Sequence, residues 1–208
     1  MGLHLFIWEY EKDLEVIKLK IYCIIGESCT GKDTVLTKLL QKRKDLTPII
    51  TYTTRPMRDG EKNGKEYYFV TKQSFEKLWS SYSIIEYRKY NTIHGEWLYF
   101  TAKDNQIDEK SDKKYIVITT LYGVKKFREI FGNNVIPIHL YVNDRDRILR
   151  CFARETNGNN DYVEMCRRFV SDTKDYSKEM FEKFKITDTR VINDNIMSCL
   201  NEINNIIK

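Results

Sequence analysis

Short apolar runs alternate with segments of helical periodicity along most of the chain. The run 21–25 is unbroken and ends at a glycine, which is typical of a strand covered on both faces of a parallel sheet. Three further runs, 115–119, 136–142 and 190–192, are predicted as strands of the same sheet. The alternation of strands and helices predicts an α/β fold with a parallel sheet and helices on both faces.

The helices are predicted from apolar residues three or four positions apart. Segments 35–40, 124–130 and 161–176 have this spacing. In the last helix the apolar residues lie at 196, 200, 203 and 207. One stretch, 49–101, holds several β-like pieces (49–53, 67–70, 84–87 and 96–101) and a single short helix near 74–79, so it is predicted as an inserted β-rich lobe.

Composition and charge narrow the class of protein. The 208 residues suit one domain, and 41% hydrophobic with 31% charged residues is ordinary for a globular chain. The net charge of +5 comes from scattered lysines and arginines rather than from one basic stripe, so we expect no nucleic-acid partner. A pocket for polyphosphates would account for such an excess.

The cysteines and the first residues bear on the compartment. Five cysteines are an odd number without a CxxC pair, which predicts reduced thiols rather than a disulfide framework or a zinc site. Residues 1–17 lack the basic region and apolar core of a signal peptide, and no run approaches the about 20 apolar residues that span a bilayer. We therefore expect a cytoplasmic protein without a membrane partner, with 1–17 as an extension of unknown role.

Residues 26–32, GESCTGK, match the phosphate-binding pattern G-x-x-x-x-G-K between a strand and a helix. The glycines allow a tight turn of backbone N–H groups, and the lysine reaches the β- and γ-phosphates. The predicted ATP-binding residues of this loop are Gly26, Glu27, Ser28, Cys29, Thr30, Gly31, Lys32, Asp33 and Thr34.

Asp33 stands where Ser or Thr usually follows the lysine of this pattern. A carboxylate is a good ligand for Mg²⁺, so we expect Asp33 to hold Mg²⁺ directly or through water. The alternative is a surface acid at a helix N-terminus, favoured by the helix dipole.

A second phosphate site is predicted from residues 51–61, TYTTRPMRDGE, followed by Gly64 and YYFV at 67–70. Arg55 and Arg58 can form bidentate hydrogen bonds to a phosphate, and Tyr67 adds an uncharged donor. With the phosphate loop, these residues resemble the guanylate kinase family, whose lobe carries T-T-R-x-P-R-x-G-E and then G-x-x-Y-x-F-V. The resemblance covers about residue 21 to the C-terminus.

The resemblance implies a fold and a set of domains. The expected fold is the three-layer α/β fold of P-loop NTPases, with a central parallel sheet, an inserted monophosphate-binding lobe and an arginine-rich helical lid. The core would comprise 18–48, 102–142 and 177–208, the lobe 49–101 and the lid 143–176.

The resemblance also implies roles for single residues. Glu86 falls on the glutamate that accepts hydrogen bonds from guanine N1–H and the exocyclic amine, and Asn193 lies where the family holds adenine. The implied GMP-binding residues are Thr51, Arg55, Arg58, Tyr67, Glu86, His94 and Thr120.

Three positions depart from the family pattern. His94 replaces a tyrosine expected at the acceptor phosphate, and Glu96 replaces a small hydroxyl residue near guanine O6, so Glu96 is expected to point elsewhere. Thr120 replaces an aspartate that would contact guanine, and the acidic residue near Mg²⁺ is missing as well. We expect Asp33 to supply that carboxylate.

Six arginines lie within 145–168. Arg150 and Arg154 are four positions apart on one helix face and match the family's R-x-x-x-R lid motif, and Arg168 matches the arginine of the next lid helix. Fixed guanidinium groups stabilise the charge of phosphoryl transfer. The expected catalytic residues are Lys32, Arg150, Arg154 and Arg168; for Arg145, Arg147 and Arg167, lid function and surface ion pairing stay open.

The predicted function is Mg²⁺-assisted phosphorylation of GMP or dGMP by ATP, in a monomer or homodimer whose partners are small nucleotides. Two alternatives stay open: a kinase for another phosphorylated acceptor such as a ribose bisphosphate, and a non-catalytic guanylate-kinase-like binding module. Intact Gly26, Gly31 and Lys32 argue against the binding module.

Overall fold

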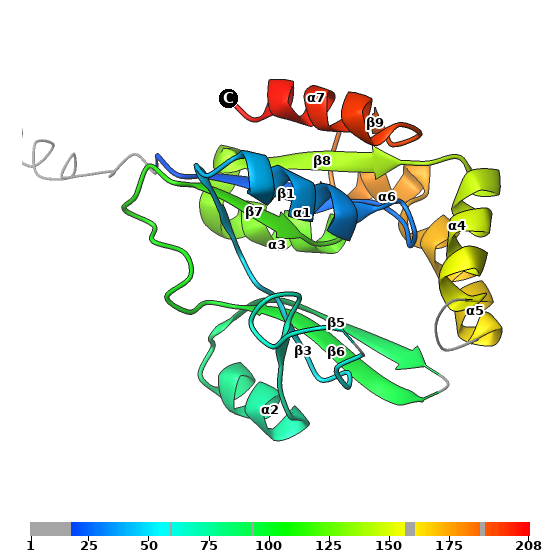
Figure 1. The fold of residues 1–208 in the computed structure, drawn as a ribbon. Coiled ribbons are helices and arrows are strands. Elements are labelled where there is room, and N and C mark those ends of the chain that lie inside the picture. Colours follow the sequence, from blue (N-terminus) through cyan, green and yellow to red (C-terminus); the bar gives the residue numbers. More distant parts are fainter. Residues whose placement is uncertain (1–17, 59, 93, 157–160, 188–189) are drawn as a thin grey trace, which may run out of the picture.

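A computed structural model describes residues 18–208 except 59, 93, 157–160 and 188–189 (Figure 1). The predicted extension 1–17 therefore lies outside the described residues. The elements in chain order are β1 Lys20–Ile25, α1 Lys32–Lys42, β2 Leu46–Pro48, β3 Tyr52–Thr53, β4 Tyr68–Phe69, α2 Lys72–Ser80, β5 Ile84–Thr92, β6 Gly95–Ala102, β7 Lys114–Ile118, α3 Leu121–Phe131, η1 Gly132–Asn134, β8 Val135–Tyr141, α4 Asp144–Thr156, α5 Tyr162–Asp175, α6 Lys178–Lys183, β9 Arg190–Ile192 and α7 Ile196–Ile206.

The core sheet is parallel, as predicted. Within the described residues its strand order is β2-β7-β1-β8-β9. The predicted strand 21–25 is β1 at its centre, where Tyr22 is in register with Ile116 of β7 and Ile136 of β8. Because β1 has neighbours on both edges and helices on both faces, its apolar run is buried from Ile21 to Ile25.

Helices cover both faces of this sheet, which gives the predicted three layers (Figure 1). On one face, Ile21, Cys23 and Ile25 of β1 pack with apolar residues of α3 and with Phe181 of α6. On the other face, Tyr22 and Ile24 pack with apolar residues of α1 and α7. The alternation of side chains along β1 thus divides the core into two clusters.

The inserted segment forms a second sheet of order β4-β3-β6-β5 among the described residues. β5 and β6 make a long antiparallel hairpin, and β3 joins β6 antiparallel and β4 parallel. Helix α2, predicted near 74–79, packs on this sheet through Phe75, whose ring centroid lies 5.1 Å from that of Phe100. Figure 1 shows this sheet below the core, joined to it by the chain on either side.

The prediction of one strand over 49–53 is wrong. The chain instead leaves the core sheet after β2 and enters the second sheet at β3. At Ile50, in between, the side-chain amide of Gln106 replaces a neighbouring strand: it accepts from the Ile50 N–H at 2.8 Å and donates to the Ile50 carbonyl at 3.1 Å. This satisfies the backbone groups of the crossing segment.

Two helices, α4 and α5, form the arginine-rich segment at one end of the core sheet (Figure 1). Asp161 caps α5 by accepting from the Glu164 N–H at 3.1 Å. The short helix α6 that follows was not predicted. Within the described part of the chain, no helix is both long and apolar enough to cross a membrane.

Candidate active site

The predicted phosphate-binding and lid residues meet at the carboxyl ends of the core strands. The phosphate loop follows β1, Thr120 follows β7, α4 follows β8 and Asn193 follows β9. Ligands of parallel α/β sheets bind at this edge. A pocket here is lined by residues of the loop, of α1, of α4 and of the turn after β9: Cys29, Gly31, Lys32, Asp33, Thr34, Lys38, Arg150, Arg154, Asn193, Asp194 and Ile196.

Both glycines of the loop are required by its geometry. Gly26 has φ +146°, and a Cβ there would lie 2.5 Å from the carbonyl oxygen of Leu140. Gly31 has φ +90°, and a Cβ there would lie 2.6 Å from the Asn193 side-chain nitrogen. The first helical backbone bond of α1 runs from the Val35 N–H to the Gly31 carbonyl, so the N–H groups of residues 32–34 have no partner in the helix and are available to an anion.

Lys32 folds back over the loop. Its Nζ donates to the carbonyls of Gly26 at 2.7 Å and Glu27 at 2.8 Å. Burial lowers the pKa of Lys32, and the charges of Asp33, Asp172 and Glu27 oppose that shift. The ammonium group therefore lies against the loop, on the path that a bound polyphosphate would take.

Two residues after the arginine pair of α5 also hold the loop, and no sequence motif predicts either of them. The Asp172 carboxylate accepts from the Ser28 N–H at 2.7 Å, and the Tyr176 hydroxyl accepts from the Gly26 N–H at 3.2 Å. Burial raises the pKa of Asp172, while the Ser28 N–H and the Lys32 charge oppose the rise. The lid segment therefore contacts the phosphate loop directly.

A disulfide joins Cys29 of the loop to Cys151 of α4, with a Cα–Cα separation of 5.5 Å. The prediction of reduced thiols is wrong for this pair, because the fold brings two distant positions to the separation that a disulfide needs. Cys23, Cys166 and Cys199 are free, and all five cysteines lie within the described residues.

In the inserted lobe, Arg55 is engaged by Glu61. Its two terminal nitrogens donate to the two Glu61 oxygens at 2.9 and 2.7 Å, and the Arg55 side chain is only 3% exposed. The guanidinium also lies 5.4 Å from the ring centroid of Tyr67. Burial raises the pKa of the Tyr67 hydroxyl, and the charge of Asp33 at the start of α1 adds to the rise.

Arg154 lines the pocket with Lys32 and shares one carboxylate oxygen of Glu155 with Arg168, at 3.3 and 2.8 Å respectively. Burial and the charges of Arg168 and Arg58 lower the pKa of Arg154, whereas the charge of Glu155 raises it. Arg154 in turn lowers the pKa of Lys32. Cations that lie close together repel one another, and a bound polyanion relieves this repulsion. A group of cations from the loop, the acceptor lobe and both lid helices is therefore suited to bind a polyanion.

The other arginines of α4 and α5 divide between two roles. Arg150 donates to the Asn193 carbonyl at 2.8 Å, while the Asn193 side chain donates to the Thr30 carbonyl at 2.8 Å, so both residues brace the loop. Arg147 is buried against Phe169, with Asp144 and Asp172 as ion-pair partners. Arg167 pairs with Glu164 at 2.7 Å. For Arg147 and Arg167 the structure thus shows ion pairing.

Glu86 lies on β5 with its side chain fully buried. One carboxylate oxygen accepts from the Thr101 hydroxyl at 2.9 Å, and the other has no hydrogen-bond partner within the described residues. Thr51 is also buried, ahead of β3, and Thr120 caps α3 by accepting from the Gly123 N–H at 3.3 Å. The half-satisfied carboxylate marks a place for a ligand's donor groups.

The tip of the hairpin approaches the lid. His94 Nε2 lies 2.8 Å from the Asp161 carboxylate that caps α5. Glu96 lies on the opposite face of the hairpin, within 3.2 Å of Lys72 and 2.6 Å of Lys89. Glu96 therefore points away from Glu86, as expected from its charge.

The donor set fits a magnesium ion held jointly with phosphates. Asp33 is exposed in the first turn of α1, beside the pocket that Thr34 also lines. The described residues contain no cluster of three or more His, Cys, Asp or Glu that could bind a metal alone. Mg²⁺ commonly takes one or two protein ligands and completes its shell with phosphate oxygens and water.

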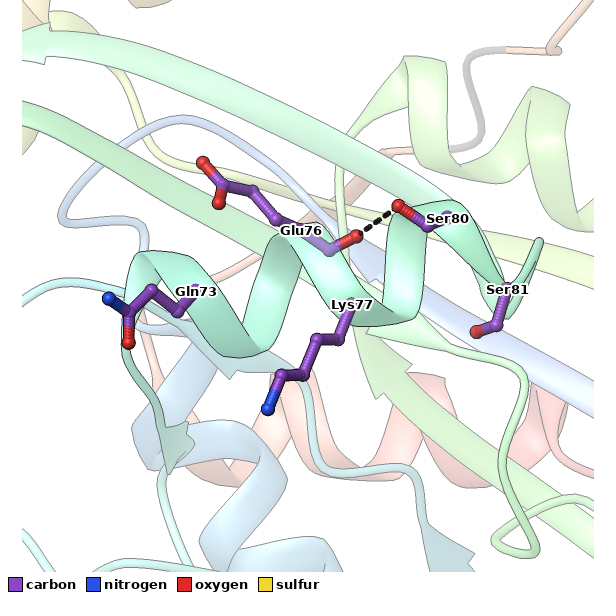
Figure 2. A pocket seen from close by; sticks show the side chains of 5 residues that line it. All are labelled: Gln73, Glu76, Lys77, Ser80 and Ser81. Carbon is purple, nitrogen blue, oxygen red and sulfur yellow. Dashed lines mark hydrogen bonds between the residues drawn. The ribbon is translucent and has the colours of Figure 1, made fainter.

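A second hollow, on the outer surface of α2, lacks this chemistry. Figure 2 shows its side chains projecting from one helix and its end, with the Ser80 hydroxyl bonded to the Glu76 carbonyl at 2.8 Å. No glycine loop or arginine lines it. The phosphate-loop edge of the sheet is therefore the candidate site.

The family model described as guanylate kinase matches residues 18–208. The chain belongs to the guanylate kinase family. Its resemblance to guanylate kinases extends to relatives from several organisms. Guanylate kinase 2, chloroplastic/mitochondrial, of Oryza sativa subsp. japonica is 32% identical over 132 residues, which is 62% of this chain but 45% of that protein.

A guanylate kinase of Porphyromonas gingivalis is 25% identical over 187 residues, 88% of this chain and 94% of that protein. The crystal structure of guanylate kinase from Anaplasma phagocytophilum has a TM-score of 0.62 at 19% identity, covering 91% of this chain and 85% of that one. The guanylate kinase fold is thereby confirmed.

Proposed function

We propose that this protein transfers the γ-phosphoryl group of ATP to GMP, with dGMP as an alternative acceptor, and releases ADP and GDP. The observation that carries the proposal is the position of Arg154: it lines one pocket with Lys32 of the phosphate loop, and it shares a Glu155 oxygen with Arg168 of α5. The charge of Arg58 from the acceptor lobe also lowers the pKa of Arg154. A site that joins donor-phosphate and acceptor-phosphate cations is what phosphoryl transfer between two nucleotides requires. The names of the relatives support the same activity.

In this proposal the protein contributes positioning and charge rather than a nucleophile. The loop N–H groups and Lys32 hold the β- and γ-phosphates, and Arg58 with Tyr67 holds the acceptor phosphate. An acceptor phosphate oxygen attacks the γ-phosphorus, the bond to the β-phosphate oxygen breaks, and the electron pair leaves with ADP. Arg154, Arg168 and Arg150 stabilise the charge spread over the transferred group.

Arg55 supports the acceptor site through Glu61, which accepts from both Arg55 and the Arg58 N–H at 2.8 Å. Glu86, Thr51 and Thr120 are proposed to contact guanine, His94 to lie at the acceptor phosphate, and the Asn193 turn to hold adenine. Mg²⁺, held by Asp33 or Thr34, would neutralise part of the phosphate charge when bound. Localisation in the cytoplasm and a monomeric or homodimeric state stay predictions.

The test is product identification by anion-exchange chromatography after incubation with Mg-ATP and single acceptors: GMP, dGMP, AMP, CMP, UMP and ribose 1,5-bisphosphate. ADP and GDP in equal amounts with GMP are expected. An Arg58→Ala variant should lose at least about tenfold in kcat/KM for GMP, whereas Lys62→Ala, an exposed neighbour, should not. The proposal is contradicted if ADP forms only with ribose 1,5-bisphosphate. It is also contradicted if ADP forms with none of the acceptors.

A further inference from the structure

Arg88 lies beside Glu86 on the sheltered face of the hairpin. Along β5, Glu86, Arg88 and Tyr90 are less exposed than Tyr87 and Lys89 between them. The Arg88 side chain is 18% exposed and that of Glu86 is fully buried. An arginine on this face is unexpected for packing alone, because a guanidinium is costly to bury without partners.

The pairing of these two residues is incomplete. Arg88 Nε lies 3.3 Å from Glu86 Oε2, yet neither atom has a hydrogen-bond partner within the described residues. The other Glu86 oxygen is fixed by Thr101. The pair therefore presents unused acceptor and donor capacity side by side.

The surroundings of Arg88 connect it to Tyr67, a predicted acceptor-phosphate residue. Burial lowers the pKa of Arg88, but the charge of Glu86, with Tyr90, Tyr67 and Tyr176, reverses the shift and keeps the guanidinium charged. Tyr67 belongs to the acceptor lobe, and the Tyr176 hydroxyl contacts the Gly26 N–H. Arg88 is in register with Tyr99 of β6, and the Tyr99 ring centroid lies 5.7 Å from that of Tyr67, so Arg88 lies on the face of the hairpin against which Tyr67 packs.

Guanine presents an acceptor, O6, next to two donors, N1–H and the exocyclic amine. A carboxylate alone pairs with the donors and leaves O6 without a partner. Arginine is well suited to guanine O6 and N7, because its N–H groups match these acceptors in geometry. Adenine carries an amino donor in place of O6, which a guanidinium would repel.

We propose that Arg88 is a specificity-determining residue that donates to O6 of the acceptor guanine, while Glu86 accepts from N1–H and the exocyclic amine. This inference rests on the proposed function, because it assumes that the acceptor is GMP. The adjacent groups on one strand then match the whole edge of guanine and exclude adenine through both charges.

Isothermal titration calorimetry with GMP and 6-thio-GMP tests the contact, since sulfur is a weak acceptor in the place of O6. The wild type should bind GMP at least about tenfold more tightly than 6-thio-GMP. In Arg88→Met the ratio should fall to about one, because the group that senses O6 is gone. The matched control is Lys89→Met, on the opposite face of β5, which should keep the wild-type ratio.

The ratio of the two affinities separates recognition of O6 from a structural role of Arg88. If Arg88 had only a structural role, its loss would weaken the binding of GMP and of 6-thio-GMP equally. The wild-type arm needs no variant, so it decides the matter even where Arg88→Met fails to fold: equal binding of GMP and 6-thio-GMP overturns the inference. An unchanged ratio in folded Arg88→Met overturns it too. Turnover of GMP without this discrimination contradicts only the role of Arg88, whereas discrimination in binding without turnover contradicts only the proposed function.

Discussion

Cys29 in the phosphate loop is bonded to Cys151 in α4, although 122 positions separate them in the sequence. The bond ties the loop to the helix that carries Arg150 and Arg154. It closes a long segment of chain, and the loss of such a bond commonly costs about 2–4 kcal/mol of stability.

The first prediction concerns thiols. Denatured protein should show three reactive thiols without reductant and five after reduction, because Cys23, Cys166 and Cys199 are free. Cys151→Ser should lower the free energy of unfolding by about 2–4 kcal/mol in urea titrations. Cys166→Ser, at an exposed free cysteine, is the control. Five reactive thiols before reduction would contradict the bond.

The second prediction concerns Lys32. Lys32→Met should lower kcat by about 10²–10³, since the ammonium group is proposed to hold the β- and γ-phosphates in the transition state. Its circular dichroism spectrum should match that of the wild type. Lys42→Met, in the last turn of the same helix, should keep full activity. Equal losses in both variants would mean that the helix, not the ammonium group, is at fault.

The third prediction concerns acid stability. Burial raises the pKa of Glu61, but the hydrogen bonds from Arg55 and the Arg58 N–H more than offset this, so its pKa lies below the usual value. A carboxyl with a depressed pKa in the folded state contributes stability that is present above its unfolded pKa and is lost as pH falls through the folded pKa.

Glu61→Gln should therefore cost about 2 kcal/mol at neutral pH and flatten the fall in stability between about pH 5 and about pH 3. Urea unfolding across this range measures both effects. Glu76→Gln, on the exposed side of α2, serves as the control. A variant whose stability falls with acid as steeply as that of the wild type would rule out the contribution of this ion pair.

The fourth prediction concerns magnesium. Asp33→Asn should raise the Mg²⁺ concentration for half-maximal ADP formation about tenfold, because it removes the charge of the proposed ligand. Asp45→Asn, beyond the other end of α1 and paired with Arg43, should leave the requirement unchanged. An unaltered Mg²⁺ requirement in Asp33→Asn would exclude Asp33 as a ligand.

Most of the correct predictions came from the spacing of residues that are close together in the sequence. The loop at Gly26 and Gly31 and the core strands were predictable, because glycine turns and apolar runs are determined by nearby residues. The break at Ile50 was not, since it depends on the Gln106 side chain arriving from far along the chain. The arginine spacing predicted Arg58, and the resemblance added Arg154 and Arg168, which the structure brings together on one oxygen of Glu155.

The remaining features of the site depend on which side chains meet. Cysteine counting could not find the bond between Cys29 and Cys151, because an odd total gives no pairing. The contact of Asp172 with the Ser28 N–H links α5 to the loop, and no motif marks it. Arg88 was not predictable for the same reason: in the sequence it is one basic residue in a polar strand.

The central claim is that this site phosphorylates GMP and distinguishes it from other nucleotides by the edge of the base. The most direct test is kcat/KM for GMP against kcat/KM for AMP, at saturating Mg-ATP. A base that leaves the buried polar groups of the site without hydrogen-bond partners is strongly rejected. The ratio should therefore be about 10³ or more in favour of GMP. Equal values for the two acceptors, or no turnover of GMP, would contradict the account.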